Sequence, residues 1–316
     1  MAASAKTLTV ENPSLNGEWK IVLPRRARRR KTSLGAKSPQ QPQQQQQQSS
    51  SWAPSDFESD IIRESKLLQK MQICMKKLEV SQFFLTLLDQ IQTPEISDCF
   101  HRILGSESKM KMVIYGIGSI ESYESPRLQL SLAILLRKKF NWIGEIEVFD
   151  PVLSATEARV LEALGCSVLS INEQGRRLAQ NPTLFFMPHC EAELYNNLLQ
   201  SNWEVGFLNH IALFGNSFET YEQHFSVFKN SKVAESAKHI LGVRKFTEEF
   251  RIQTVSDDYF AAFHDSSWHF FRPVPAFLAP NDDDDDVPEL QQDEEKAEVE
   301  EEEKEEGAVN NSGSEC

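Results

Sequence analysis

Apolar residues recur at three- and four-residue spacings in the first part of the central region, residues 56–105. This spacing places Leu67 and Met71 on one face of a helix. Ser81 is suited to cap the start of a second helix, and Pro94 fits the first turn of a third helix. The pattern therefore predicts a helical segment at the beginning of the folded region.

From residue 112 onward, short apolar runs alternate with stretches that have helical spacing. The short runs are apolar on both faces, which is typical of strands in a parallel sheet covered by helices on both sides. We therefore predict an α/β fold: a Rossmann-like, doubly wound and mainly parallel sheet, preceded by the helical segment. Strands are expected at 112–115, 145–149, 167–171, 184–187 and 211–214.

Helix start signals follow two of the expected strands. Ser125 and Pro126 predict the N-cap and the first position of a helix after the first strand. Ser154 and Glu157 have the spacing of a capping box, so a second helix is expected from there to Gly165.

Charge is distributed unevenly along the chain of 316 residues. Residues 1–50 contain nine Lys or Arg and two Glu, whereas residues 282–316 contain 17 Asp or Glu and two Lys. The net charge of −14 is therefore mostly a property of the acidic tail. Both ends are predicted to be disordered, over 1–55 and 282–316, because they hold too few apolar residues to form a core. A single α/β domain is expected over 56–281.

The five cysteines form an odd number and include no C-x-x-C spacing. This usage predicts reduced thiols and a location in the cytoplasm or the nucleus. The sequence shows no apolar leader and no run of 18 apolar residues, so we expect a soluble protein without a secretory signal.

A run of basic residues stands beside a Gln-rich stretch in the N-terminal region. Such a run is typical of a nuclear import signal, and contact with nucleic-acid phosphates is the alternative. The central region has no basic stripe with interleaved aromatic residues, so direct nucleic-acid binding is not expected there. The residues of this import run are Arg25, Arg26, Arg28, Arg29, Arg30 and Lys31.

Two glycines, Gly116 and Gly118, follow the first expected strand, where nucleotide-binding folds place a phosphate-binding loop. Asp150 ends the second strand, where such folds hold ribose hydroxyls, and it lies 32 residues after Gly118. The third glycine of the fingerprint is replaced by Glu121, which would repel a phosphate. The loop is therefore either a small-molecule site or a tight turn in which glycine permits a positive φ.

Polar or small residues end several of the expected strands, and the carboxyl ends of parallel strands share one edge of a sheet. Arg127 either faces an anion there or is a solvated residue at a helix start. His189 and Cys190 form either a catalytic or metal-binding pair or a hydrogen-bonded histidine beside a buried thiol; neighbours on a strand end point in opposite directions, which argues against activation of the thiol. Asn216 and Ser217 either pin a loop or line the crevice. The candidate pocket residues are Gly116, Gly118, Ser119, Arg127, Asp150, His189, Asn216 and Ser217.

Several of these segments together resemble the Sensitivity to Red Light Reduced family. The resemblance covers about residues 105–275, and the order and spacing of the segments are more specific than any one of them. The segments are Tyr-Gly-Ile-Gly-Ser (115–119), Ser-Pro-Arg-Leu-Gln-Leu (125–130), Val-Phe-Asp-Pro (148–151), Phe-Met-Pro-His-Cys (186–190), Leu-Tyr-Asn-Asn-Leu-Leu (194–199) and Gly-Asn-Ser-Phe (215–218).

The resemblance implies a plant regulator of phytochrome B red-light signalling and of circadian clock input, present in the nucleus and the cytoplasm. It implies protein partners of unspecified identity and brings no catalytic residues with it.

Two functions follow from the sequence as alternatives. The first is a regulatory, non-catalytic protein whose α/β domain binds a partner or a small ligand. The second is a Rossmann-like enzyme that binds a nucleotide or an S-adenosyl compound. The sequence contains no complete catalytic or metal-ligand pattern, which favours the first alternative, and it leaves the cofactor unassigned.

Overall fold

The computed structural model describes residues 52–54, 60–227, 236–254 and 257–272. The basic import run and the acidic tail both lie outside these residues.

Three helices precede the first strand, as the apolar spacing predicts. Asp60 caps the first helix, because its carboxylate accepts a hydrogen bond from the backbone N of Ile62 at 2.8 Å. Ser81 caps the second helix in the same way, and Pro94 occupies the first turn of the third. These helices are α1 (Ile61–Glu79), α2 (Gln82–Ile91) and α3 (Pro94–Leu104).

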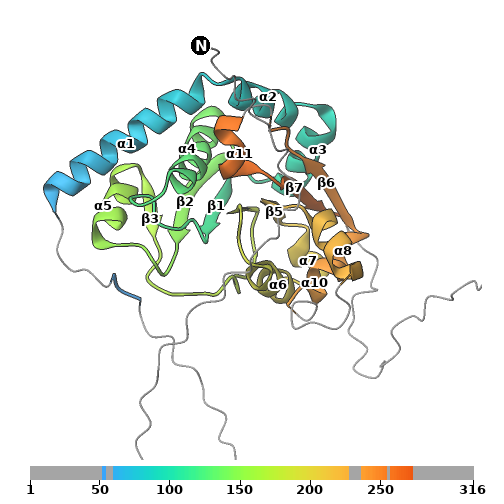
Figure 1. The fold of residues 1–316 in the computed structure, drawn as a ribbon. Coiled ribbons are helices and arrows are strands. Elements are labelled where there is room, and N and C mark those ends of the chain that lie inside the picture. Colours follow the sequence, from blue (N-terminus) through green and yellow to red (C-terminus); the bar gives the residue numbers. More distant parts are fainter. Residues whose placement is uncertain (1–51, 55–59, 228–235, 255–256, 273–316) are drawn as a thin grey trace, which may run out of the picture. The chain divides into compact units, whose positions relative to one another are not determined.

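The described strands form one seven-stranded sheet in the order β3-β2-β1-β4-β5-β7-β6 (Figure 1). β1 to β5 are parallel to one another, whereas β7 is antiparallel to both β5 and β6. The parallel part confirms the predicted Rossmann-like, mainly parallel sheet. The strands are β1 (Met110–Tyr115), β2 (Ile143–Phe149), β3 (Cys166–Val168), β4 (Thr183–Met187), β5 (Ile211–Asn216), β6 (Thr247–Arg251) and β7 (Ser266–Phe271).

Alternate residues of the central strands are buried on opposite faces of the sheet. Met112 and Ile114 belong to the core cluster under α1–α4 and α11, whereas Val113 and Tyr115 belong to the cluster under α6 and α10. This is why the strands read as continuous apolar runs. The helices that follow β1 are α4 (Glu124–Lys139), α5 (Ala155–Ala163), α6 (Ala192–Ser201), α7 (Val205–Leu208), α8 (Phe218–Val227), α10 (Lys238–Arg244) and α11 (Asp257–Phe263).

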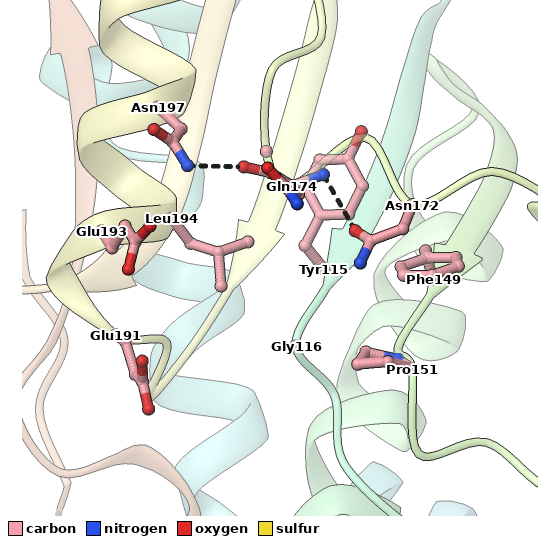
Figure 2. Close-up of a pocket in the computed structure, with 11 residues that line it drawn as sticks. Tyr115, Gly116, Phe149, Pro151, Asn172, Gln174, Glu191, Glu193, Leu194 and Asn197 are labelled. Carbon is pink, nitrogen blue, oxygen red and sulfur yellow. Dashed lines mark hydrogen bonds between the residues drawn. The ribbon is translucent and has the colours of Figure 1, made fainter. Parts of the chain in front are cut away.

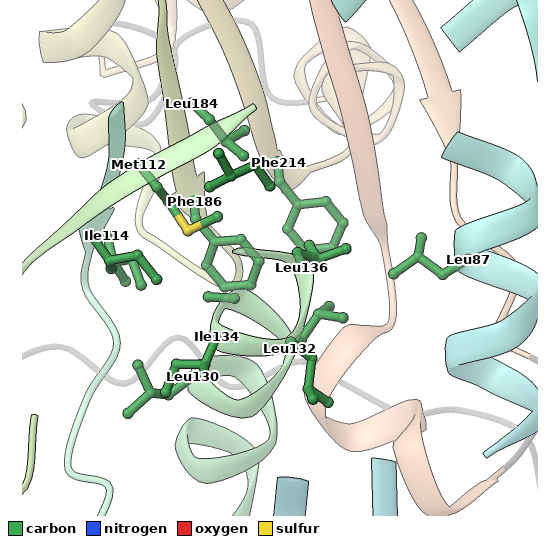
Figure 3. Packing of buried hydrophobic residues seen from close by; sticks show 14 of the residues in the cluster. Leu87, Met112, Ile114, Leu130, Leu132, Ile134, Leu136, Leu184, Phe186 and Phe214 are labelled. Carbon is green, nitrogen blue, oxygen red and sulfur yellow. The ribbon is translucent and has the colours of Figure 1, made fainter. Parts of the chain in front are cut away.

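Helix α4 lies in the middle of one helical layer and is buried from Leu128 to Leu136. Leu132 and Leu136 pack near Phe186 and Phe214 of the sheet (Figure 3). Burial of each such side chain stabilises the fold by about 1.5–3 kcal/mol. Helix α4 is therefore firmly packed on the sheet, and it fixes the position of the loop that joins it to β1.

Three details differ from the sequence-based expectation. β3 ends at Val168, whereas the expected strand ran to residue 171. α4 begins at Glu124, with Tyr123 as its N-cap, so Ser125 lies inside the helix rather than capping it. The antiparallel strands β6 and β7 were not predicted. β6 reads as the polar stretch Thr-Glu-Glu-Phe-Arg and has no fully buried residue, whereas β7 is buried at every position. The capping box of Ser154 and Glu157 is confirmed.

Trp52, which falls in the segment predicted to be disordered, contacts the folded domain. Its backbone N donates to the carbonyl of Ser170 at 2.6 Å, and its ring meets that of Phe149 edge to face at 5.5 Å. In the part of the chain that the structure describes, no helix has the length and apolar character needed to span a bilayer. Cys74, Cys99, Cys166 and Cys190 are buried free thiols.

Candidate ligand-binding site

The loop between β1 and α4, residues 116–123, makes a tight turn at the carboxyl edge of the sheet. Gly116 and Gly118 both have a positive φ, 66° and 74°, which glycine adopts without strain. A side chain at Gly116 would also place its Cβ only 2.6 Å from the Sγ of Cys190. The first glycine is therefore required by the packing of the protein itself. We call this segment the glycine loop.

The polar groups of the glycine loop are bound by neighbouring side chains. The backbone N of Gly118 donates to the carboxylate of Asp150 at 2.7 Å. Glu157, which is 1 % exposed, accepts from the hydroxyl of Ser119 at 2.7 Å and from the backbone N of Glu121 at 2.9 Å. These donors are the ones that a phosphate would need. Because these donors are already bonded to side chains of the protein, the loop is a closed turn.

Arg127 is part of the same closed turn. It is half-buried, and its guanidinium donates to the carbonyls of Ile120 and Glu121 at 2.9 and 3.2 Å. Asp150 is 6 % exposed and also accepts from the backbone N of Val152 at 2.9 Å. In this structure, both residues thus hold backbone groups at the strand edge.

The end of β4 is held by β5. The backbone N of His189, which has a strained φ of 59°, donates to the side-chain oxygen of Asn216 at 2.7 Å. The amide of Asn216 donates in turn to the carbonyl of Cys190 and to the hydroxyl of Tyr221. Ser217 is fully buried, and its hydroxyl accepts from the backbone N of Thr220. Asn216 and Ser217 therefore pin loops in the structure.

His189 and Cys190 point to different surroundings. The His189 ring lies 4.4 Å from the ring of His264, and burial lowers the pKa of His189. The thiol of Cys190 contacts the carbonyl of Tyr115 at 3.2 Å, and burial raises the pKa of this thiol far above its usual range. A buried, protonated thiol is a poor nucleophile, and the histidine is not placed to activate it. No group of three or more potential metal ligands is found among the described residues.

A cavity of about 250 Å³ lies beside the glycine loop, at the same carboxyl edge. Figure 2 shows α6 with Glu191, Glu193 and Leu194 on one side, and Phe149 and Pro151 on the other. We call it the strand-edge pocket. Of the eight predicted residues, only Gly116 lines this pocket. Its lining residues are Tyr115, Gly116, Phe149, Pro151, Asn172, Gln174, Gly175, Glu191, Glu193, Leu194 and Asn197.

A chain of charged and polar groups supports one wall of this pocket. The hydroxyl of Tyr115 binds Glu173, and Arg177 bridges Glu173 and Glu147. Burial and the bond to Glu173 raise the pKa of Tyr115, so it stays protonated at neutral pH. Burial acts to raise the pKa of Glu147, but the hydrogen bonds from Lys111 and Arg177 outweigh it and lower that pKa. The tyrosine is thereby fixed in place at the pocket.

The sequence reasoning missed most of the pocket, although one signal was present. Asn172 and Gln174 follow β3, and thus stand at a strand end, the position used to select the other candidates. Asn197 gave no such signal, because it lies within α6 among apolar residues. Its burial, with 5 % exposure, is known only from the packing of α6.

The fold and the pocket define a class: a Rossmann-like α/β protein with a ligand-sized cavity at the carboxyl edge of its parallel strands. Residues 85–270, more than half of the chain, match the SRR1 domain family. The chain is 58 % identical over 267 residues to Protein SENSITIVITY TO RED LIGHT REDUCED 1 of Arabidopsis thaliana, covering 83 % of this chain and 94 % of that protein. It therefore belongs to the SRR1 domain family, as the sequence resemblance implied.

More distant relatives share only part of the chain. An SRR1-like protein of Mus musculus is 43 % identical over 123 residues, which are 38 % of this chain and 49 % of that protein.

Among solved structures, a putative O-methyltransferase from Klebsiella pneumoniae has a TM-score of 0.35 and 9 % identity, covering 68 % of this chain and 92 % of that one. The plantazolicin methyltransferase BpumL in complex with SAH has a TM-score of 0.26 and 10 % identity, covering 67 % and 98 %. Likeness of this extent says nothing about function.

Proposed function

We propose that this chain is a regulator of red-light signalling that acts through its Rossmann-like domain. The observation that supports the proposal is the 58 % identity to the Arabidopsis protein over 94 % of that protein's length. In detail, we propose a role in phytochrome B signalling and in circadian clock input, with protein partners bound by the folded domain. The protein would work in both the nucleus and the cytoplasm.

Complementation tests the red-light role. The chain would be expressed in Arabidopsis seedlings that lack the related protein, and stem elongation would be measured across red-light intensities. We expect the response to red light to be restored, and the period of a clock reporter to return to that of normal seedlings. A response that stays impaired, with the protein present at normal abundance, would contradict the proposal.

The import run provides the proposed route to the nucleus. Replacement of Arg28, Arg29 and Arg30 by Ala should lower the nuclear fraction of a fusion too large to diffuse through nuclear pores. The control replaces Lys6, Lys20 and Lys37, which are basic residues of the same region outside the run. An unchanged nuclear fraction in the Arg variant would count against this role.

A second candidate function is a nucleotide- or S-adenosyl-binding enzyme, and the strand-edge pocket is the observation that favours it. Its position, beyond the carboxyl ends of β1, β2 and β4, is where doubly wound folds bind ligands. No catalytic residue can be assigned there. The regulatory role and small-ligand binding are compatible, since a regulator can respond to what its pocket holds.

A further inference from the structure

The strand-edge pocket has a preformed wall. Gly175 has a φ of 78°, and a Cβ there would lie 2.7 Å from the carbonyl oxygen of Leu194, so this loop lies directly on α6. The side chain of Asn197 donates to the carbonyl of Gln174 at 2.9 Å, and the backbone N of Gln174 donates to Asn172 at 2.9 Å (Figure 2). The wall is therefore held in place without a ligand, as is usual for small-molecule sites.

The pocket is acidic. Glu191, the N-cap of α6, and Glu193, in its first turn, line the pocket, and none of its eleven lining residues is basic. The helix N-terminus contributes the equivalent of about half a positive charge, which two carboxylates exceed several-fold. A phosphate group would therefore be repelled here, whereas an uncharged or cationic group would be accepted.

One cation stands close to the pocket without lining it. Arg176 donates to the side-chain oxygen of Gln174 at 2.6 Å and is exposed to solvent. Arg177, by contrast, is bound to Glu173 and Glu147. Arg176 is thus a residue through which a phosphate could still bind, and its removal distinguishes a phosphate site from a phosphate-free site.

Size and wall chemistry narrow the ligand further. The cavity of about 250 Å³ lies just below the range of roughly 300–1,000 Å³ for ligand pockets, so a dinucleotide is too large for it. Pro151 and Leu194 provide apolar surface for a flat ring, and Asn172 and Gln174 provide amides that can bind ring nitrogens or hydroxyls.

We infer that the strand-edge pocket binds a phosphate-free, nucleoside-type ligand whose polar end is uncharged or cationic and lies beside Glu191 and Glu193. The inference rests on the proposed function in one respect: it specifies the small ligand of the Rossmann-like domain. It excludes nucleotides from that role because of their phosphate charge, and dinucleotides also because of their size.

Matched probes test this directly on the full chain. Adenosine and AMP differ only by a phosphate, and S-adenosylmethionine and S-adenosylhomocysteine differ only by a methyl group and its positive charge. We expect adenosine to raise the thermal unfolding temperature and to bind at least tenfold more tightly than AMP in titration calorimetry. We also expect S-adenosylmethionine, with its sulfonium charge, to bind at least as tightly as S-adenosylhomocysteine, whose net charge is zero.

A charge-removing variant locates the site. The double variant Glu191→Gln with Glu193→Gln should lower the ratio of adenosine affinity to AMP affinity several-fold, mainly because AMP binds more tightly. The control is Glu162→Gln with Glu204→Gln, two exposed acids that do not line the pocket, which should leave the ratio unchanged. If the ratio is unchanged in the first variant too, the ligand lies elsewhere and the inference is wrong.

Other outcomes also overturn the inference. AMP binding equal to or tighter than adenosine binding, with loss in Arg176→Ala, would show a phosphate site built on that arginine. No shift with any of the four probes would show that the pocket does not take this class. Neither result touches the red-light proposal, which complementation decides separately: a pocket variant that binds no probe but restores the seedling response leaves the regulatory function standing.

Discussion

The glycine loop and the strand-edge pocket adjoin the same strand end, but they use their polar groups differently. In the loop, Gly118 is bound to Asp150, and Ser119 is bound to Glu157. In the pocket, amides and carboxylates line a cavity of about 250 Å³. The comparison teaches that polar residues at a strand end can serve either the scaffold or a ligand, and that Gly116 belongs to both regions.

The difference has a physical cause. A buried donor or acceptor without a partner costs about 1–3 kcal/mol, so a tight turn must bind its own backbone groups. The loop does this with two acids, Asp150 and Glu157, which are nearly inaccessible to solvent. Glu191 and Glu193, by contrast, are exposed and line the cavity. The regions should therefore respond differently to mutation.

Gly116→Ala should have the largest effect on stability. The new Cβ would meet the Sγ of Cys190 at 2.6 Å, and the positive φ alone costs about 1–2 kcal/mol in a residue with a side chain. We expect a loss of at least about 2 kcal/mol in the free energy of unfolding, measured by urea denaturation. Gly206→Ala, where nothing lies within 4 Å of the new Cβ, is the matched control.

The double variant Gly116→Ala with Cys190→Ala separates the two causes. Removal of the sulfur relieves the clash but not the backbone strain, so the double variant should lose less than the sum of the two single losses. Strictly additive losses would mean that the thiol does not determine the need for glycine at this position.

Asp150→Ala should have an intermediate effect, confined to the scaffold. It leaves the backbone N of Gly118 and that of Val152 without their acceptor, which should lower the free energy of unfolding by about 1–3 kcal/mol. Asp98→Ala, at an exposed helix position, should change it little. The ratio of adenosine to AMP affinity should stay the same. A changed ratio with unchanged stability would mean that Asp150 acts on a ligand, as in the sequence-based hypothesis.

Asn197→Ala should have the smallest effect on stability and act mainly on the pocket. It removes the bond to the carbonyl of Gln174, which should cost about 1 kcal/mol or less. Because that bond holds the pocket wall, adenosine affinity should fall more than stability does. Gln200→Ala, an exposed position on the same helix, is the control. Intact adenosine binding in the Asn197 variant would show that the wall does not need this residue.

Local patterns predicted much of the fold. The apolar strands, Ser81 and the capping box at Ser154 each act over a few residues, and the structure confirms them. Ser125 was predicted as the N-cap, but the helix begins two residues earlier than expected, at Glu124 instead of Pro126. The antiparallel edge escaped prediction because β6 carries polar residues and owes its place to pairing with β7.

The sequence predicted that several polar groups share one edge of the sheet, but not which of them bind one another. At the carboxyl edge of the sheet, Gly118 contacts Asp150, and His189 contacts Asn216. Which of these groups bind one another could not be read from spacing, since the partners come from strands far apart in the chain. The pocket residues of α6 and of the loop after β3 were missed for the same reason.

The sequence by itself determined the layered α/β class and the family, and it indicated which polar groups end the strands, because periodicity and short motifs act locally along the chain. Only the tertiary structure decided which polar groups hold the scaffold and which face a cavity. That decision depends on distances between separate strands, such as the approach of Cys190 to Gly116 and of Leu194 to Gly175, and these distances are set by how the helices pack on the sheet.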